Sequence, residues 1–418
     1  MSGDGAPDLA RILRAREAVA GHIRPTPVLR SRSIGERCGS QVTLKAENLQ
    51  RTGSFKLRGA LAKLATLPPG TPGVIAGSAG NHAQSLALAA RTRGVPCEVV
   101  MPGDAAIAKV DAAASFGATV TLVPGPVDDA IARARDRAAA TGAVVVHPFD
   151  DPDVIAGQGT LGIEIAEQVP DVARVVVPVG GGGLAAGIAV ALAALKPGAA
   201  VVGVQAEGCA PVAAALSGST AAADRPFPSI ADGIAVKRPG ALTLPILERH
   251  LDDVVTVGEE EIAAAVVMLL ERSKLLVEGA GAVGVAAALA GRLPPLAAGP
   301  TVVVLSGGNI DVGLVEALTR RHETLAGRRL VVATRVGDRP GTLVALLRLV
   351  GDGGGNILEV DHVREGISLH VRETGVRLVI ETRGEQHAQG LLAAMRDAGY
   401  AVEREPGGLD GAAASPLS

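Results

Sequence analysis

Lys56 is the residue of this sequence with the clearest potential for covalent chemistry. It lies in the segment Gly53-Ser54-Phe55-Lys56-Leu57-Arg58-Gly59-Ala60, where the pattern predicts the first turn of a helix that Ser54 could cap. The positive end of a helix dipole disfavours an ammonium group and favours the neutral amine. A neutral lysine amine is the form that condenses with carbonyl groups. Most lysines at helix starts are purely structural, so this segment needs support from others.

Two further segments could bind anions through backbone amides. Ser78-Ala79-Gly80-Asn81-His82 lies between a predicted strand and a predicted helix, so its amide hydrogens are available to a carboxylate. Gly180-Gly181-Gly182-Gly183 also separates a strand from a helix, and four glycines let the backbone wrap a phosphate. No Gly-Lys-Ser/Thr follows, so the loop is not a Walker A motif, and it fits the dinucleotide-binding spacing poorly. The alternative for each segment is an ordinary strand-to-helix turn.

A fourth segment, Ser306-Gly307-Gly308-Asn309, follows a run of valines. A hydroxyl group at the carboxyl end of a strand can contact a ring nitrogen of a bound cofactor. The elements that must position all four segments alternate between short β-rich runs and Ala-rich helical stretches over residues 40–320. Continuous valine runs flanked by helices predict parallel strands that are buried on both faces. Such an open α/β fold binds ligands at the carboxyl ends of its strands.

The predicted strands of this part span residues 42–46, 73–77, 97–101, 119–123, 143–147, 174–179, 200–205 and 301–306. Two of the predicted helices span Asn81 to Arg93, closed by Gly94, and Ala105 to Phe116, closed by Gly117. Residues 320–329 are charged and polar and are interpreted as a linker. Beyond them, strand and helix patterns alternate in the order βαββαβ, which is the ferredoxin-like split unit.

Composition excludes several classes of function. The net charge is −3, and the chain has no Trp, one Tyr and four Phe, so neither a basic surface nor aromatic stacking platforms for nucleic acid are expected. Three dispersed cysteines without a CxxC motif indicate neither a disulfide framework nor a structural zinc site. The apolar runs are shorter than the roughly 20 residues of a membrane span, and no signal pattern is present. We therefore expect a soluble, cytoplasmic protein without nucleic-acid or membrane partners.

Together, GSFKLRGA, SAGNHAQ, PVGGGGL and SGGN resemble the fold type II family of pyridoxal-phosphate enzymes, which has two open α/β subdomains with mostly parallel sheets. The stretches ENLQRTGSFK, ADGIAVKRPG and VEGAGAVGVAA are similar to the branch of threonine and serine dehydratases and serine racemases. The resemblance covers roughly residues 10–320. The C-terminal module resembles an ACT domain, an amino-acid-sensing module. The implied domains are a catalytic domain over 1–322 with a smaller subdomain over about 48–150, an ACT-like domain over 328–405 and a disordered tail over 406–418.

The resemblance implies a role for each matching residue. Lys56 would bind pyridoxal 5'-phosphate covalently and then remove the Cα proton of the substrate, and Ser306 would meet the pyridine nitrogen as a neutral partner. The other implied cofactor-binding residues are Phe55, Asn81, Gly180, Gly181, Gly182, Gly183, Gly233 and Glu278. Asn81 would contact the phenolic oxygen of the cofactor, and the glycines 180–183 would hold its phosphate. The implied substrate-carboxylate site consists of Ser78, Ala79, Gly80, Asn81 and His82.

The expected function is elimination of ammonia from L-threonine to give 2-oxobutanoate, with side activity on L-serine, as in a threonine ammonia-lyase. One methyl group discriminates by only about 1–3 kcal/mol, so serine or threo-3-hydroxyaspartate ammonia-lyases and serine racemase are the alternatives. Ala79 stands where the racemases have a serine acid, so elimination should dominate. A sensor that has lost catalysis is the alternative outside enzymes. Retention of Lys56, Asn81, the four glycines and Ser306 argues against it.

Other expectations concern metals, effectors and assembly. Glu207 is a candidate metal ligand, but residues 208–214 offer no second carboxylate, so no metal site is expected. Asp338, Arg339, Pro340, Gly341 and Asn356 would frame an amino-acid effector site between paired C-terminal modules. Isoleucine or valine is the expected allosteric effector if the enzyme serves isoleucine biosynthesis. A module that only dimerises is the alternative, and both parts of the chain resemble families that form homodimers or homotetramers.

Overall fold

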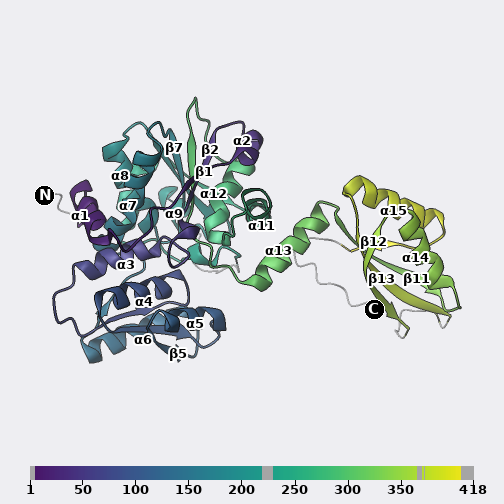
Figure 1. The fold of residues 1–418 in the computed structure, drawn as a ribbon, viewed down its shortest axis with the longest axis horizontal. Helices are drawn as coiled ribbons and strands as arrows, with labels where there is room; N and C mark the ends of the chain where they lie inside the picture. The colour runs from purple at the N-terminus through teal and green to yellow at the C-terminus, as the bar shows by residue number, and fades with distance from the viewer. Residues whose placement is uncertain (1–4, 219–228, 365–369, 371, 406–418) are drawn as a thin grey trace. The chain divides into compact units, whose positions relative to one another are not determined.

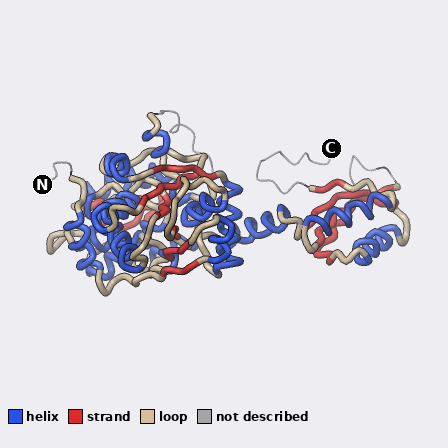
Figure 2. Tube along the Cα trace, turned by 90° about the horizontal axis from the view of Figure 1, so that it is seen from above, coloured by secondary structure: helices blue, strands red, loops and turns tan. Residues whose placement is uncertain are grey.

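The chain folds into two units, residues 1–310 and 311–418 (Figure 1). The computed structural model describes residues 5–218, 229–364, 370 and 372–405. The tail predicted over 406–418 lies outside the described residues. Within the first unit, strands and helices alternate as the valine runs predicted, and helices enclose the strands (Figure 2).

The larger sheet of the first unit has six strands in the order β1-β2-β10-β7-β8-β9. All neighbours pair in parallel except β1 and β2. The strands are β1 (Val28–Arg30), β2 (Val42–Ala46), β7 (Arg174–Pro178), β8 (Ala200–Ala206), β9 (Asp253–Val257) and β10 (Thr301–Leu305). Because β2, β7 and β10 are parallel neighbours, the segments that follow them meet at one edge of the sheet. Those segments contain Lys56, the four glycines and Ser306.

The smaller sheet has four parallel strands in the order β5-β4-β3-β6. They are β3 (Val74–Gly77), β4 (Cys97–Pro102), β5 (Thr119–Val123) and β6 (Val144–Val145). Helices α4 (Asn81–Arg93), α5 (Ile107–Ser115) and α6 (Val127–Thr141) connect them. Gly94 ends α4 in the left-handed conformation, as predicted from its position after Arg93. Ser78 to His82 therefore lie at the carboxyl end of β3.

Other helices cover the larger sheet on both faces, and in Figure 1 α7 and α8 lie on the side opposite α12. The helices outside the smaller sheet are α1 (Leu9–Val19), α2 (Arg32–Cys38), α3 (Lys56–Ala65), α7 (Pro152–Gln168), α8 (Gly183–Leu195), α9 (Pro211–Leu216), α10 (Thr243–His250), α11 (Glu259–Met268) and α12 (Gly279–Leu289). Short 3-10 turns span Glu47–Leu49 (η1) and Asp232–Ile234 (η2), and a π-helical turn spans Leu269–Ser273 (η3). None of the helices in the described part of the chain combines the length and apolar character needed to cross a membrane.

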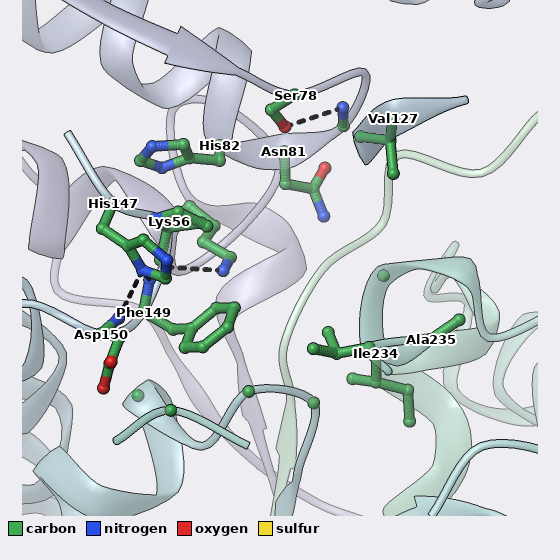
Figure 3. Close-up of a pocket in the computed structure, with 18 of the residues that line it drawn as sticks. Lys56, Ser78, Asn81, His82, Val127, His147, Phe149, Asp150, Ile234 and Ala235 are labelled. Atoms are coloured by element: carbon green, nitrogen blue, oxygen red, sulfur yellow. Dashed lines mark hydrogen bonds between the residues drawn. The ribbon is translucent and has the colours of Figure 1, made fainter. Parts of the chain in front are cut away.

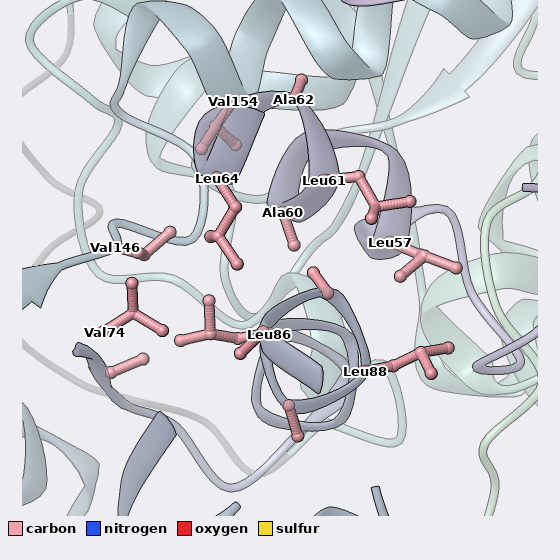
Figure 4. Packing of buried hydrophobic residues seen from close by; sticks show 14 of the residues in the cluster. Leu57, Ala60, Leu61, Ala62, Leu64, Val74, Leu86, Leu88, Val146 and Val154 are labelled. Carbon is pink, nitrogen blue, oxygen red and sulfur yellow. The ribbon is translucent and has the colours of Figure 1, made fainter. Parts of the chain in front are cut away.

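Helix α7 packs against both α3 and α8, the two helices that begin at the candidate site. A Cβ atom at Gly157 of α7 would lie within 3.0 Å of the Arg58 carbonyl of α3, and one at Gly187 of α8 would lie equally close to the α7 backbone. The backbones therefore touch without intervening side chains. On its other face, α3 packs Leu57, Leu61 and Leu64 into the apolar core that it shares with α4 (Figure 4).

A buried ionic network lies behind the same helix. The Arg58 guanidinium donates to both oxygens of Glu47 at 2.8 Å and to Glu164 at 2.6 Å. The Lys45 ammonium lies 2.6 Å from the other Glu164 oxygen. The side chains of Lys45, Glu47 and Arg58 are fully buried. The network thus connects β2 and η1 to α3 and α7, and Arg58 contributes to it from the first turn of α3, which begins at Lys56.

The second unit contains a four-stranded antiparallel sheet in the order β12-β13-β11-β14. Its elements are α13 (Val312–Leu325), β11 (Arg329–Gly337), α14 (Thr342–Asp352), β12 (Asn356–Val363), β13 (Glu373–Glu381), α15 (Glu385–Asp397) and β14 (Glu403–Arg404). From β11 onward this is the predicted βαββαβ order. Residues 320–325 of the stretch interpreted as a linker are helical and form the end of α13.

Candidate active site

A cavity of about 1100 Å³ opens between the two sheets of the first unit. All residues to which the sequence assigned a cofactor or carboxylate role line it, together with Asn309. Figure 3 shows the Lys56 side chain pointing into this space, with Ser78 and Asn81 on one side and Phe149 on another. Ile234 and Ala235 lie across the cavity from Lys56.

Lys56 is the first residue of α3, as predicted, and its ammonium nitrogen lies 3.0 Å from the Pro148 carbonyl oxygen. It also lies 5.1 Å from the centroid of the Phe55 ring. Burial lowers the pKa of Lys56 to about 8, although the nearby Glu278 carboxylate acts in the opposite direction. A substantial fraction of the amine is therefore neutral near pH 8, which is the nucleophilic form.

Ser54 does not cap this helix, contrary to the prediction. Phe55 occupies the cap position without a side-chain cap bond, and the buried Ser54 hydroxyl has no hydrogen-bond partner among the described residues. Instead, Ser54 forms an isolated β-bridge with Gly307, and the Phe55 amide donates to the Ser306 carbonyl at 3.1 Å. The segment before Lys56 is thus positioned by the loop that follows β10.

The glycine loop crosses the cavity at the start of α8. Gly182 adopts a left-handed conformation with φ of 96° and precedes the helix. The Gly181 carbonyl accepts hydrogen bonds from the Thr243 hydroxyl at 2.6 Å and from the Gly240 amide at 3.3 Å. The first amides of an α-helix have no partner within the helix, so this end of α8 can bind an anionic group such as a phosphate.

The loop at residues 78–82 offers the second anion-binding position. The Ser78 hydroxyl accepts a hydrogen bond from the Gly80 amide at 3.3 Å, and α4 begins at Asn81. The buried His82 ring uses Nε2 to donate to the Val146 carbonyl at 2.8 Å. Burial, aided by the charge of Lys56, lowers the pKa of His82 to about 3. The neutral His82 ring brings no positive charge to the site, so backbone amides are the anion-binding groups here.

Asn81, Glu278 and Asn309 meet beside Lys56. The Asn81 amide donates to the Glu278 carboxyl at 2.8 Å, and Asn309 donates to the Asn81 side-chain oxygen at 2.7 Å. Burial raises the pKa of Glu278 to about 7, with the Asp232 carboxylate adding to the effect. Gly233 lies close to Glu278, because a Cβ atom there would be 3.5 Å from a Glu278 oxygen.

The sequence reasoning missed the segment 147–150. Its backbone bends around the His147 ring, whose Nδ1 accepts from the amides of Phe149 and Asp150 at 3.3 and 2.8 Å. The Phe149 ring packs against Gly181 so closely that a Cβ atom on that glycine would overlap it. The position of 147–150 after a predicted parallel strand was the available signal, since ligands bind at such strand ends.

The structure shows the surroundings of Glu207, the candidate metal ligand, and the positions of the residues predicted to bind an effector. Glu207 is half exposed and lies 3.9 Å from the Arg292 guanidinium, which also pairs with Glu261. No cluster of three or more His, Cys, Asp or Glu residues suited to a metal ion occurs within residues 5–218, 229–364, 370 and 372–405. In the second unit, Gly337 pairs with Glu373, whereas Asn356 pairs with Glu381 at the other end of β13. The structure therefore does not bring Asn356 and the turn 338–341 together within one chain.

The lining of the cavity fits pyridoxal 5'-phosphate. The lowered pKa of the Lys56 amine suits reaction with its aldehyde, the amides at the start of α8 suit its phosphate, and the buried Ser306 lies at the carboxyl end of β10. The model of the pyridoxal-phosphate dependent enzyme family matches residues 19–307. The chain belongs to this family. It is therefore an enzyme that depends on pyridoxal phosphate.

Relatives extend the match over both units. The L-threonine ammonia-lyase of Thermotoga maritima is 43% identical over 94% of this chain and 98% of its own length. The catabolic L-threonine dehydratase TdcB of Escherichia coli K12 is 43% identical over 74% of this chain and 94% of its own. The solved T.th. threonine deaminase is 40% identical, covers 73% of this chain and 99% of its own, and has a TM-score of 0.69. Maize serine racemase has a TM-score of 0.71 at 32% identity, with 77% and 99% covered.

Proposed function

We propose that the first unit converts L-threonine to 2-oxobutanoate and ammonia, with L-serine as a second substrate. The observation that supports this most is that one cavity is lined by Lys56, whose pKa burial lowers to about 8, by the start of α8 and by the loop 78–82. The relatives named L-threonine ammonia-lyase and threonine deaminase support the choice of substrate.

Each residue of the site then has one task. The amides of the glycine loop hold the cofactor phosphate, and the amides of residues 78–82 hold the substrate carboxylate. When bound, the cofactor stabilises negative charge at the Cα atom of the substrate. Lys56 Nζ would accept the Cα proton while the β-hydroxyl leaves with a proton as water, and hydrolysis of the resulting imine gives 2-oxobutanoate and ammonia. Ser306 offers the ring nitrogen a neutral hydroxyl, which favours elimination over transamination.

Part of the cavity wall is apolar and suits the methyl group of threonine. Phe149, Ile234 and Ala235 present apolar surface that can accommodate a methyl group (Figure 3). Two cations of the lining are already paired, Lys109 with Asp232 at 3.0 Å and Lys237 with Asp128. Arg135 and Arg238 also line the cavity, so charge alone does not exclude the second carboxylate of hydroxyaspartate, and a turnover assay decides between the two substrates. Ala79 supplies no acid, so racemisation should be slow.

A turnover panel tests this proposal. The purified protein with pyridoxal phosphate is assayed for keto-acid release from L-threonine, L-serine, threo-3-hydroxyaspartate and D-serine. Threonine should give the highest kcat/KM, and serine should follow within roughly 10- to 200-fold. A preference for hydroxyaspartate would contradict the substrate assignment but leave the fold and the cofactor unchanged.

For the second unit, we propose an amino-acid effector site shared by two copies of the chain. Within one chain, Asn356 and the turn 338–341 lie at opposite ends of β13, roughly 27 Å apart for eight residues of strand. The edge strand β12 exposes Leu358, Val360 and Val363. Two such edges side by side in antiparallel orientation would bring Asn356 of one copy towards the turn of the other.

Binding measurements on the full chain test the effector site. Isoleucine or valine should bind with two equivalent sites per shared interface, one at each Asn356, and change the kcat/KM for threonine. The Asn356→Ala variant should lose that response while its basal turnover stays unchanged. A monomer in solution that still responds to isoleucine would contradict the shared site.

A cytoplasmic location stays a prediction from the sequence.

A further inference from the structure

A chain of side-chain amides runs from the backbone beside Lys56 to the buried Glu278. Asn309 Nδ2 donates to the Thr52 carbonyl at 2.8 Å and to Asn81 Oδ1 at 2.7 Å. Asn81 Nδ2 in turn donates to Glu278 Oε1 at 2.8 Å. Asn309 comes from the loop after β10, Asn81 from the first position of α4, and Glu278 from the position before α12. Their hydrogen bonds therefore link segments that are far apart in the sequence.

The direction of this chain is fixed at the Thr52 end. A backbone carbonyl can only accept hydrogen bonds, so the NH₂ group of Asn309 must face Thr52. The same NH₂ group then reaches Asn81, so Asn81 must present its oxygen to Asn309. Glu278 alone would not decide the orientation, because with its pKa raised to about 7 by burial it can accept or donate. Asn309 therefore determines which end of the Asn81 amide faces Glu278.

Two glycines make room for this arrangement. A Cβ atom at Gly53 would lie within 3.0 Å of Asn309 Oδ1, and Gly53 also has a left-handed φ of 70°. A Cβ atom at Gly307 would lie 3.1 Å from Asn81 Nδ2 and closer still to Glu278 Oε1. The hydrogen bond between the Gly308 amide and the Gly53 carbonyl, at 2.9 Å, fixes the two loops to each other. Asn309 is thus confined to one position beside Asn81.

Asn81 Nδ2 has two hydrogens, and within the described residues Glu278 takes one of them. We propose that Asn309 is a positioning residue that locks the Asn81 carboxamide with its NH₂ group towards the cofactor and Glu278. The second hydrogen is then directed at the cavity, where it can donate to an oxygen of the cofactor. This rests on the proposed function in one respect, namely that Asn81 contacts the cofactor's phenolic oxygen. A reversed amide would present a carbonyl oxygen to that oxygen and repel it.

The orientation can be measured directly by NMR. The sequence has only four asparagines, at positions 48, 81, 309 and 356, so the full-length holoenzyme labelled with ¹⁵N-asparagine gives four side-chain NH₂ signals. The Asn81 signal is the one lost in Asn81→Ala. Asn309→Asp loses at least one of the two donated hydrogen bonds, because a carboxylate donates none and a neutral carboxyl group only one, so the Asn81 signal should shift strongly. Gln389→Glu, an amide-to-acid change on α15, should leave it in place.

Kinetics and cofactor spectra of paired variants supply the second test. Asn309→Ala should lower kcat for threonine by roughly 10-fold, the effect of about one hydrogen bond, with KM nearly unchanged. It should also shift the pH titration of the visible absorbance band of the lysine-bound cofactor. Because Asn309 acts through Asn81, the double variant should be no slower than Asn81→Ala alone. Independent roles would instead multiply the two losses.

The outcomes separate the inference from the proposed function. An unmoved Asn81 signal in Asn309→Asp, or multiplicative losses in the double variant, would overturn the positioning role. If Asn309→Asp does not fold, Asn309→Ser removes one of the two donated hydrogen bonds and is read by the same NMR signal. If the wild-type protein binds the cofactor but does not release keto acid from threonine, the proposed function fails. The NMR result still decides the role of Asn309 in that case.

Discussion

Arg58 stabilises the first unit far more than an exposed arginine would, and replacing it with methionine tests the buried network. The substitution keeps much of the volume of the side chain but removes three hydrogen bonds to carboxylates. Glu47 is left fully buried without its cation, whereas Glu164 keeps Lys45 at 2.6 Å. Loss of one partner of a buried ion pair costs about 3–5 kcal/mol, because the remaining charge is uncompensated.

The chain provides a matched control. Arg16 of α1 forms a bidentate pair at 2.7 and 2.8 Å with Glu167, which lies on α7 like Glu164. Both side chains of this pair are about half exposed. Such surface pairs contribute about 0–1 kcal/mol. Arg16→Met should therefore lower the free energy of unfolding only slightly, although it removes the same kind of contact.

Urea denaturation of the full chain separates the two units. Tyr400 is the only tyrosine, no tryptophan is present, and Tyr400 packs against the core of the second unit, so its fluorescence reports that unit. The absorbance of the bound cofactor reports the first unit. Arg58→Met should lower the midpoint of the cofactor signal by roughly 1 M urea and leave the tyrosine transition in place. Equal midpoints for Arg58→Met and Arg16→Met would refute the argument.

Three other predictions follow from the site. Attachment of pyridoxal phosphate to the cofactor-free protein should speed up as pH rises, with half of the increase reached near pH 8, because only the neutral Lys56 amine reacts. A midpoint near 10.5 in the absorbance kinetics would contradict the lowered pKa. Gly181→Ala should weaken cofactor binding at least roughly tenfold in an absorbance titration, since its Cβ atom would overlap the Phe149 ring. Gly198→Ala, with open space at the Cβ position, should bind normally. Burial raises the pKa of Glu278 in the folded protein to about 7, so the free energy of unfolding of the wild type should fall as pH rises towards 7 and this carboxyl group loses its proton. Glu278→Gln should remove this part of the fall. An unchanged pH profile would show that Glu278 does not titrate there.

The elements that carry strong local patterns were predictable from the sequence. The helix from Asn81 to Arg93 and the strand Val42–Ala46 have the predicted bounds, because caps and valine runs act over a few residues. Strands β1 and β9 escaped prediction. The first has three residues, and the second is an edge strand whose side chains are largely half exposed. The composition of β1 gives little signal over three residues, whereas β9, with three valines and a threonine, carried a strand signal that was overlooked.

Contacts between distant segments could not be predicted in the same way. Arg58 and Glu164 are 106 residues apart, and Asn81 and Asn309 are 228 apart, so no local pattern relates them. The motifs indicated that these positions belong to one site, yet not which atoms meet. The Ser54 prediction failed for a related reason. A local capping rule gave way to pairing with the loop at Gly307, which lies far along the chain.

The glycine contacts between α3, α7 and α8 have a consequence for how this enzyme can change. Lys56 stands at the start of α3 and the glycine loop at the start of α8, and both helices rest on α7 backbone to backbone. The spacing between the Lys56 backbone and the phosphate-binding amides is therefore set by main-chain dimensions. New substrates should accordingly arise by substitutions in the cavity walls around Phe149 and Ile234. Gly157 and Gly187, where these helices touch, should tolerate almost no substitution, because a side chain there would push the helices apart.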